Sequence, residues 1–171
     1  MTGFRQQKNI EVKGFETHTI GIVVAQFNKE ITDKLEFGAK EALLKAGLST
    51  SQIKIHRVPG AFEIPLVAQK LFDNGVDGVV ALGCVIRGET THYESVCAGA
   101  EQGCMDVQLK YGRPIGFGIL MTENLAQAQA RAGGDFGNKG AEASEVVLEI
   151  LETIKSINVT TKGEIECQMN Q

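Results

Sequence analysis

The apolar run at residues 79–86 (Val-Val-Ala-Leu-Gly-Cys-Val-Ile) is the sequence feature that most constrains the fold. A strand without a polar face is typical of a parallel sheet that helices cover on both sides. Residues 87–92 follow directly and hold two neighbouring threonines and a histidine, and a helix is expected to begin there. Because ligands of open α/β sheets bind beyond the carboxyl ends of the strands, the sequence predicts a ligand site at this point.

Strand-like and helix-like segments alternate along the rest of the chain. Further strands are expected at residues 20–25, 53–58 and 115–120. Helices are expected at residues 31–46, 63–75, 91–110, 122–131 (with Thr122 as N-cap) and 143–154. Since strand–helix–strand units make right-handed crossovers, this alternation predicts an α/β fold. We expect a three-layer αβα sandwich with a central, mainly parallel four-stranded sheet, similar to flavodoxin.

Length, composition and charge are those of an ordinary globular domain. The 171 residues are 43% hydrophobic and 22% charged, which suits one domain with a substantial core. We divide the chain into an N-terminal arm (1–18), a single domain (19–157) and a flexible polar tail (158–171). The formal net charge of −4 argues against a nucleic-acid partner, since such proteins usually carry a basic face.

Nothing in the sequence points to a membrane or to export. No apolar run approaches the roughly 20 residues that a membrane-spanning helix needs. Residues 1–14 lack the apolar core of a signal peptide. The four cysteines form no CxxC pair and no dense framework, which favours reduced thiols. We therefore expect a cytoplasmic protein without membrane contacts.

Unusual residues follow three of the expected strands, and they should meet at one edge of the sheet. They are Phe27-Asn28, residues 60–63 (Gly-Ala-Phe-Glu) and residues 87–92, while Phe117 lies between two glycines in the fourth strand. The two threonines before His92, together with the free N–H groups of the first helical turn, could hold an anion. Histidine is suited to moving protons near neutral pH. One loop therefore offers an anion cradle and an acid–base group.

Each candidate also has an ordinary structural interpretation. Phe27 could be a core residue, Glu63 could offset the dipole of the helix that it begins, and the threonines could be N-caps. Arg131 and Lys139 flank a glycine-rich segment, where they are either solvated charges or ligand contacts. The placement of the candidates at one sheet edge favours the functional interpretation.

Missing motifs exclude several chemistries. The chain contains no GxxxxGK[ST] phosphate loop, no GxGxxG after the first strand and no GxSxG hydrolase motif. His92-Tyr93-Glu94 matches the HxE of zinc deaminases, but the PCxxC that they require is absent. Three dispersed histidines and no clustered cysteines argue against a metal site.

Several separated motifs together resemble the lumazine synthase family. They are Gln26-Phe27-Asn28, Val58-Pro-Gly-Ala-Phe-Glu-Ile-Pro65, Gly83-Cys-Val-Ile-Arg-Gly-Glu-Thr-Thr-His92, Phe117-Gly118, Thr122-Glu-Asn124, Arg131-Ala-Gly133 and Gly137-Asn-Lys-Gly140. The resemblance runs from about Thr19 to Ile157. It implies the condensation of 5-amino-6-(D-ribitylamino)uracil with 3,4-dihydroxy-2-butanone 4-phosphate to 6,7-dimethyl-8-ribityllumazine. This penultimate step of riboflavin biosynthesis releases phosphate and water and uses no metal or organic cofactor.

The resemblance also implies roles for the matching positions. Phe27 would stack on the pyrimidine ring, Glu63 would hold the ribityl hydroxyls, and His92 would be the general acid–base group. Further pyrimidine contacts are implied at Ala61, Phe62, Cys84, Val85, Ile86 and, from an adjacent subunit, Phe117. The butanone phosphate would be bound by Glu89 (through its backbone N–H), Thr90 and Arg131, with Asn28 and Lys139 as additional candidates.

An assembly is implied in the same way. Members of the family form pentamers with active sites between subunits, in some cases twelve pentamers in an icosahedral shell, and riboflavin synthase is an implied partner. Two alternatives remain open: a related riboflavin synthase that dismutates the lumazine, and a non-catalytic shell protein that binds flavin or lumazine. Thr90 and Arg131 favour the condensation over the dismutation. The presence of His92 and Arg131 argues against a non-catalytic protein.

Overall fold

The computed structural model describes residue 15 and residues 17–169, with side chains up to residue 158. Its central sheet contains β1 (Ile20–Ala25), β2 (Ile53–Val58), β3 (Gly78–Ile86) and β4 (Ile115–Thr122). The four strands are all parallel and lie in the order β2-β1-β3-β4. The predicted four-stranded parallel sheet is therefore confirmed.

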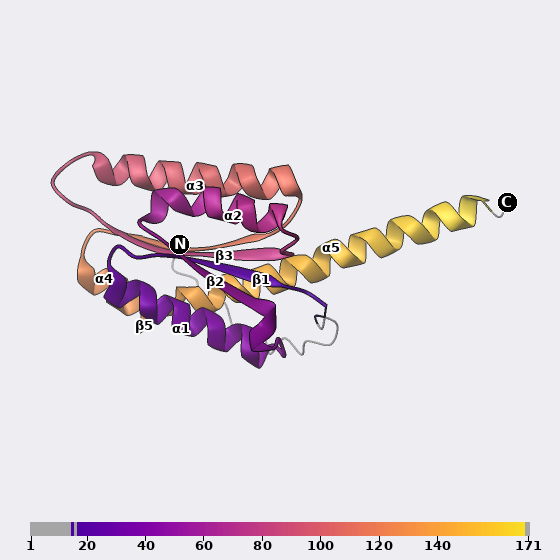
Figure 1. Cartoon of the computed structure of the whole chain (residues 1–171), viewed down its shortest axis with the longest axis horizontal. Coiled ribbons are helices and arrows are strands. Elements are labelled where there is room, and N and C mark those ends of the chain that lie inside the picture. Colours follow the sequence, from indigo (N-terminus) through magenta and orange to yellow (C-terminus); the bar gives the residue numbers. More distant parts are fainter. Residues whose placement is uncertain (1–14, 16, 170–171) are drawn as a thin grey trace.

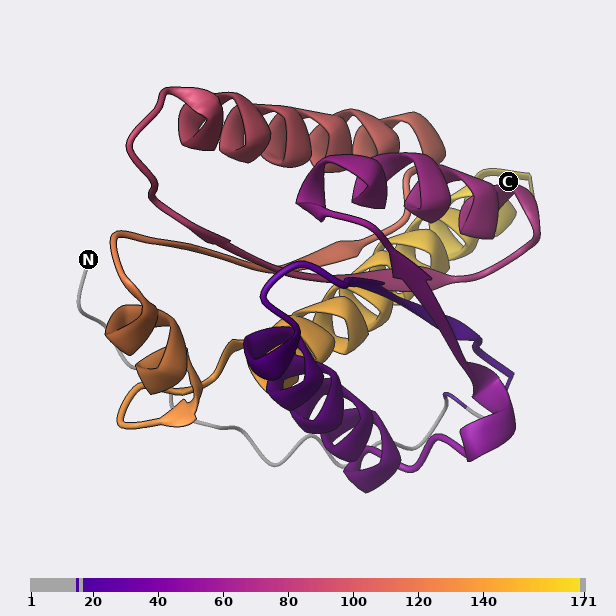
Figure 2. The same cartoon turned by 60° about the vertical axis from the view of Figure 1, so that its left-hand side comes forward.

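Helices cover both faces of this sheet, as Figures 1 and 2 show. One face carries α2 (Ile64–Asp73) and α3 (His92–Tyr111), and the other carries α1 (Lys29–Lys45), α4 (Leu125–Arg131) and α5 (Lys139–Met169). Side chains of β1 alternate between the two layers, since Ile22 and Val24 join one buried cluster while Val23 joins the other. This is the three-layer αβα sandwich that the alternation predicts.

Most helix boundaries agree with the sequence pattern to within a few residues. The helix expected at 91–110 is α3, which begins at His92, and the one expected at 63–75 is α2, with Pro65 in its first turn. The predicted cap of the short helix at 122–131 is wrong. Asn124 occupies that position and accepts a hydrogen bond from the Gln127 N–H at 3.0 Å, because Thr122 still belongs to β4 and pairs with Ile86.

The carboxyl-terminal part of the chain also differs from expectation. The backbone of α5 continues to Met169, whereas the helical pattern was expected to end near residue 154, before a flexible polar tail at 158–171. Figure 1 shows its last turns extending away from the sheet. No proline interrupts residues 158–169, and once Val147 and Leu148 have packed the helix on the core, each added turn avoids the nucleation cost.

The glycine-rich segment before α5 forms a short hairpin. Strands β5 (Ala132–Gly134) and β6 (Gly137–Asn138) pair in antiparallel fashion beside α4. Gly133 and Gly137 have φ angles of 107° and 72°, a region that residues with a Cβ rarely adopt. The glycines at these two positions therefore serve the hairpin backbone.

Candidate active site

A cavity of about 640 Å³ lies at the carboxyl ends of the parallel strands. Most of the predicted site residues line it, namely Phe27, Ala61, Phe62, Glu63, Cys84, Val85, Ile86, Thr90 and His92. They come from the ends of β1 and β3, from the turn after β2 and from the start of α3. The predicted convergence of strand ends at one edge is confirmed for these residues.

The end of β1 presents an aromatic ring to this cavity. Phe27 is 72% exposed, so its interpretation as a core residue is wrong. Asn28 follows in the left-handed region, with φ 55° and ψ 46°, and its side-chain amide donates to the Cys84 carbonyl at 2.9 Å. The Phe27 N–H donates to the Pro59 carbonyl at 3.2 Å. These two hydrogen bonds fix the backbone around an exposed phenyl ring.

The turn after β2 supplies a second aromatic ring and a carboxylate. Residues Ala61–Glu63 form a single 3₁₀ turn, and Phe62 is 58% exposed. One carboxylate oxygen of Glu63 accepts a hydrogen bond from the Gly60 N–H at 2.8 Å. Glu63 is also the N-cap residue of α2, so it has a structural role at the start of this helix as well as a place in the cavity wall.

The end of β3 offers main-chain groups more than side-chain chemistry. Cys84 is buried, and burial raises the pKa of its thiol to about 11. The thiol is therefore protonated and unreactive at neutral pH. A carbonyl oxygen has two lone pairs, so the Cys84 carbonyl can accept a second bond beside the one from Asn28.

The start of α3 combines free backbone donors with an imidazole. Thr91 is the N-cap residue, but its side chain makes no capping hydrogen bond. Thr90 Oγ1 lies 3.4 Å from the His92 backbone nitrogen, which is a long contact. Donors in the first turn are therefore left available for an anion at this end of the helix. His92 is exposed and lines the same cavity.

Several lining residues were missed in the sequence. Ser95 and Val96 lie three and four positions after His92, so helical periodicity places them on the same face of α3. This spacing was a usable signal. Gly60 and Gly88 also line the cavity through their backbones, and Tyr93 lies beneath the guanidinium of Arg87, 4.2 Å from its central carbon to the ring centroid.

Other predicted residues do not line this cavity in the single chain. Arg131, at the end of α4, lies 4.8 Å above the Phe136 ring and donates to the Gln127 carbonyl at 3.0 Å. The Lys139 ammonium pairs with Glu142 at 2.7 Å, and Glu89 is exposed on the β3–α3 loop. Phe117 lies on edge strand β4 and is 41% exposed. One protomer thus brings together the phenyl ring and the imidazole but not the Arg131 guanidinium.

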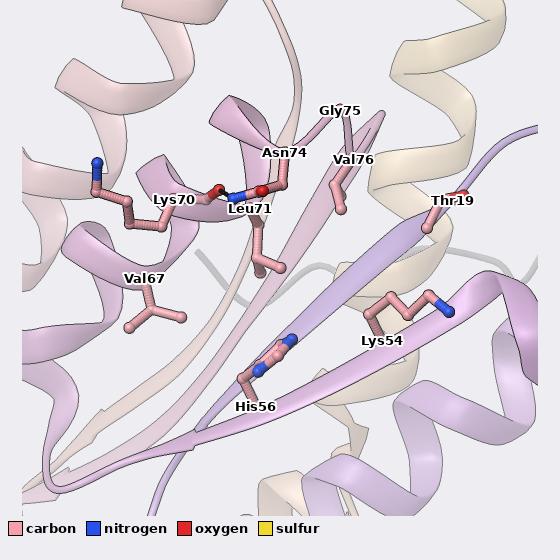
Figure 3. Close-up of a pocket in the computed structure, with 9 residues that line it drawn as sticks. All are labelled: Thr19, Lys54, His56, Val67, Lys70, Leu71, Asn74, Gly75 and Val76. Atoms are coloured by element: carbon pink, nitrogen blue, oxygen red, sulfur yellow. Dashed lines mark hydrogen bonds between the residues drawn. The ribbon is translucent and has the colours of Figure 1, made fainter.

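A second pocket of about 490 Å³ lies on the α2 side of the sheet, toward the amino ends of the strands. Figure 3 shows Lys54 and His56 on β2 below α2, with Lys70 on the helix and Asn74 at its C-cap above them. The Asn74 amide donates to the Lys70 carbonyl at 2.7 Å, and the Lys70 ammonium pairs with Asp73 at 3.0 Å. None of the predicted site residues lines this pocket.

The described part of the chain contains neither a candidate metal site nor a candidate membrane-spanning helix. Within residues 15 and 17–169, no group of His, Cys, Asp and Glu side chains could hold a metal ion. No described helix combines the length and the hydrophobicity that crossing a bilayer requires.

Comparison with known proteins identifies the family. Residues 17–155 match the family described as 6,7-dimethyl-8-ribityllumazine synthase. The protein of that name from Pediococcus pentosaceus is 49% identical over 140 residues, which cover 81% of this chain and 90% of the relative. Those of Bdellovibrio bacteriovorus (49% over 143 residues, 84% and 79%) and Coxiella burnetii (46% over 142 residues, 82% and 94%) are similar. The chain therefore belongs to the 6,7-dimethyl-8-ribityllumazine synthase family.

Proposed function

We propose that this protein condenses 5-amino-6-(D-ribitylamino)uracil with 3,4-dihydroxy-2-butanone 4-phosphate to form 6,7-dimethyl-8-ribityllumazine. The observation that carries the proposal is the carboxyl-end cavity, where an exposed phenyl ring, an imidazole and a free helix N-terminus line one space in a member of this family. The phenyl ring suits a planar heterocycle, the imidazole suits a proton-transfer step, and the helix N-terminus suits a phosphate.

The pyrimidine is assigned to the side of the cavity near β1 and β3. Phe27 would stack on its ring, a contact that contributes about 1 kcal/mol beyond burial. Main-chain groups of Ala61 and of residues 84–86 would pair with its polar edge. One oxygen of Glu63 is engaged with Gly60, and the other would accept from the ribityl hydroxyls.

The phosphate is assigned to the start of α3. Thr90 and the free N–H groups of the first turn would bind it, since anions are favoured at helix N-termini. Glu89 would contribute its backbone N–H, with the carboxylate turned away. His92, the first residue of α3, lines the same cavity and would move protons. It would serve the addition of the amine to the ketone carbonyl, the loss of water that gives the Schiff base, and the elimination of phosphate.

We propose a pentamer in which the neighbouring subunit completes this site. Phe117 is exposed on an edge strand, and Arg131 and Lys139 lie outside the cavity of their own chain, which supports a site shared between subunits. Sedimentation velocity would show a pentamer or twelve pentamers in a shell, and a monomer would contradict the shared site. A cytoplasmic location and an association with riboflavin synthase are proposed from the family alone.

The test is to mix the purified protein with both substrates and to follow the fluorescence of the lumazine. Product is expected only when both substrates are present. Conversion of lumazine alone into riboflavin would favour the dismutating enzyme instead. Tight lumazine binding without turnover would favour the non-catalytic shell protein.

A further inference from the structure

Arg87, the first residue after β3, bridges three segments at the edge of the candidate active site. Its Nε lies 2.8 Å from a carboxylate oxygen of Glu123, just after β4, and its Nη1 pairs with Glu94 in the first turn of α3. Its own N–H donates to the Thr122 carbonyl at 2.9 Å. The side chain therefore ties the ends of two strands to the helix that begins with His92.

The first turn of α3 has few other attachments among the described contacts. The N-cap Thr91 makes no side-chain capping bond, and the backbone bond from Ser95 to Thr91 is long, at 3.4 Å. The contact between Thr90 and the His92 nitrogen is equally long. Helix ends of this kind fray readily. The orientation of His92 must then depend on what holds the residues beside it.

The two residues after His92 are both held by Arg87. The guanidinium stacks on the Tyr93 ring, with 4.2 Å between its carbon and the ring centroid, while Glu94 accepts from its Nη1. Tyr93 in turn lines the cavity. Isolated exposed ion pairs contribute little. The planar guanidinium of Arg87 engages two carboxylates and one aromatic ring at the same time. It therefore fixes the relative positions of these groups, which a single ion pair would not do.

We propose that Arg87 is a positioning residue, which holds the first turn of α3, and with it the imidazole of His92, by tying Tyr93 and Glu94 to the end of β4. Arg87 does not line the cavity, so it acts through its neighbours and not on the substrate. The kinetic part of this inference rests on the proposed function, whereas the structural part does not.

The test compares Arg87→Gln with the wild type in two measurements on the whole assembled protein. We expect kcat for lumazine formation to fall about 10-fold, because small displacements of a catalytic group are costly, while the KM for the pyrimidine substrate stays nearly constant. In hydrogen–deuterium exchange, the amides of residues 91–96 should exchange about 10-fold faster. Arg87→Lys keeps the charge but lacks the planar guanidinium, so it should restore only part of both effects.

Arg57 provides a matched control. It is likewise a partly exposed arginine that bridges two carboxylates, since it pairs with Asp33 at 3.0 Å and with Glu36, but it lies outside the cavity. Arg57→Gln should leave kcat and the exchange of residues 91–96 unchanged. If Arg87→Gln folds poorly, Glu123→Gln, which removes one arm of the cluster, should shift both readouts in the same direction by a smaller factor.

Three outcomes would overturn the proposal. They are wild-type kcat and exchange in Arg87→Gln, an equal loss in Arg57→Gln, and a rise in substrate KM at constant kcat, which would make Arg87 a binding residue. Absence of lumazine formation by the wild type would defeat the proposed function alone, because the exchange measurement still decides whether Arg87 orders the turn.

Discussion

The carboxyl-end cavity and the second pocket, which lies toward the amino ends of the strands (the amino-end pocket), are at opposite ends of helix α2. The carboxyl-end cavity receives the start of α2 at Glu63 and the start of α3 at His92. The amino-end pocket receives the end of α2, at Asn74 and Gly75. Helix starts expose N–H groups and a partial positive charge, whereas helix ends expose carbonyls and a partial negative charge. The two pockets therefore differ in their backbone electrostatics before any side chain is considered.

Side-chain charge alone would assign the phosphate to the amino-end pocket and not to the carboxyl-end cavity, where we propose that it binds. Lys54, His56 and Lys70 line the amino-end pocket, while no lysine or arginine of the described chain lines the carboxyl-end cavity. Lys70 is already paired with Asp73. The proposed anion site therefore rests on the direction of the parallel strands, which sets where the helices start, and not on the number of nearby cations.

The largest expected effect separates His92, in the carboxyl-end cavity, from His56, in the amino-end pocket. His92→Ala should lower kcat about 10²-fold, the lower end of the range for general acid–base catalysis, because holding two substrates together still supplies much of the acceleration. Pyrimidine affinity, measured by equilibrium titration, should stay nearly unchanged. His56→Ala, in the amino-end pocket, should have wild-type kinetics. Equal turnover in His92→Ala and the wild type would remove the assigned role.

A smaller effect is expected when the positively charged side chain of Arg131 is removed. Arg131→Ala should raise the KM for the butanone phosphate about 10-fold or more, since hydrogen bonds to charged groups contribute roughly 1.5–3 kcal/mol. The KM for the pyrimidine should not change. Lys70→Ala is the control in the amino-end pocket and should bind both substrates normally. An unaltered KM for the phosphate substrate in Arg131→Ala would rule out phosphate binding by Arg131 and leave the helix start as the phosphate site.

The stacking ring should have a modest effect on binding. Phe27→Ala should weaken pyrimidine binding about 5-fold, as expected for the loss of roughly 1 kcal/mol of stacking, without lowering Tm, because the ring is 72% exposed. Phe37 on α1 is similarly exposed, at 68%, but lies outside the cavity, so Phe37→Ala should bind the pyrimidine like the wild type. Calorimetric titration of the three proteins would detect the difference.

The smallest effect concerns thiols. Burial raises the pKa of Cys84 to about 11 and that of Cys104 to about 12, so iodoacetamide at pH 8 should leave both unmodified until the protein is denatured. Between the usual thiol pKa of 9.0 and these values, the unfolded chain binds fewer protons than the folded one. The free energy of unfolding should therefore fall slightly as the pH rises above 9. Rapid labelling of native Cys84 would show that the carboxyl-end cavity contains a reactive thiol.

The success of sequence-based prediction varied with the range of the interactions involved. The strands and the start of α3 follow from local hydrophobic patterning, and the cavity residues follow from the rule that strand ends converge. The cap at Asn124 was missed because two neighbouring polar residues compete for that position and the extent of β4 decides between them. The length of α5 was missed because a polar composition does not by itself end a helix.

The sequence by itself determined the parallel sheet, the three layers and the edge at which Phe27, Glu63 and His92 meet, since strand polarity and periodicity are properties of short segments. Only the tertiary structure decided that Arg131 and Lys139 lie outside the cavity of their own chain. It also decided that Arg87 contacts Tyr93, Glu94 and Glu123 at the same time. These placements depend on how α4 and α3 lie relative to the ends of β3 and β4. Such distances are set by contacts between segments far apart in the chain, which no local pattern encodes.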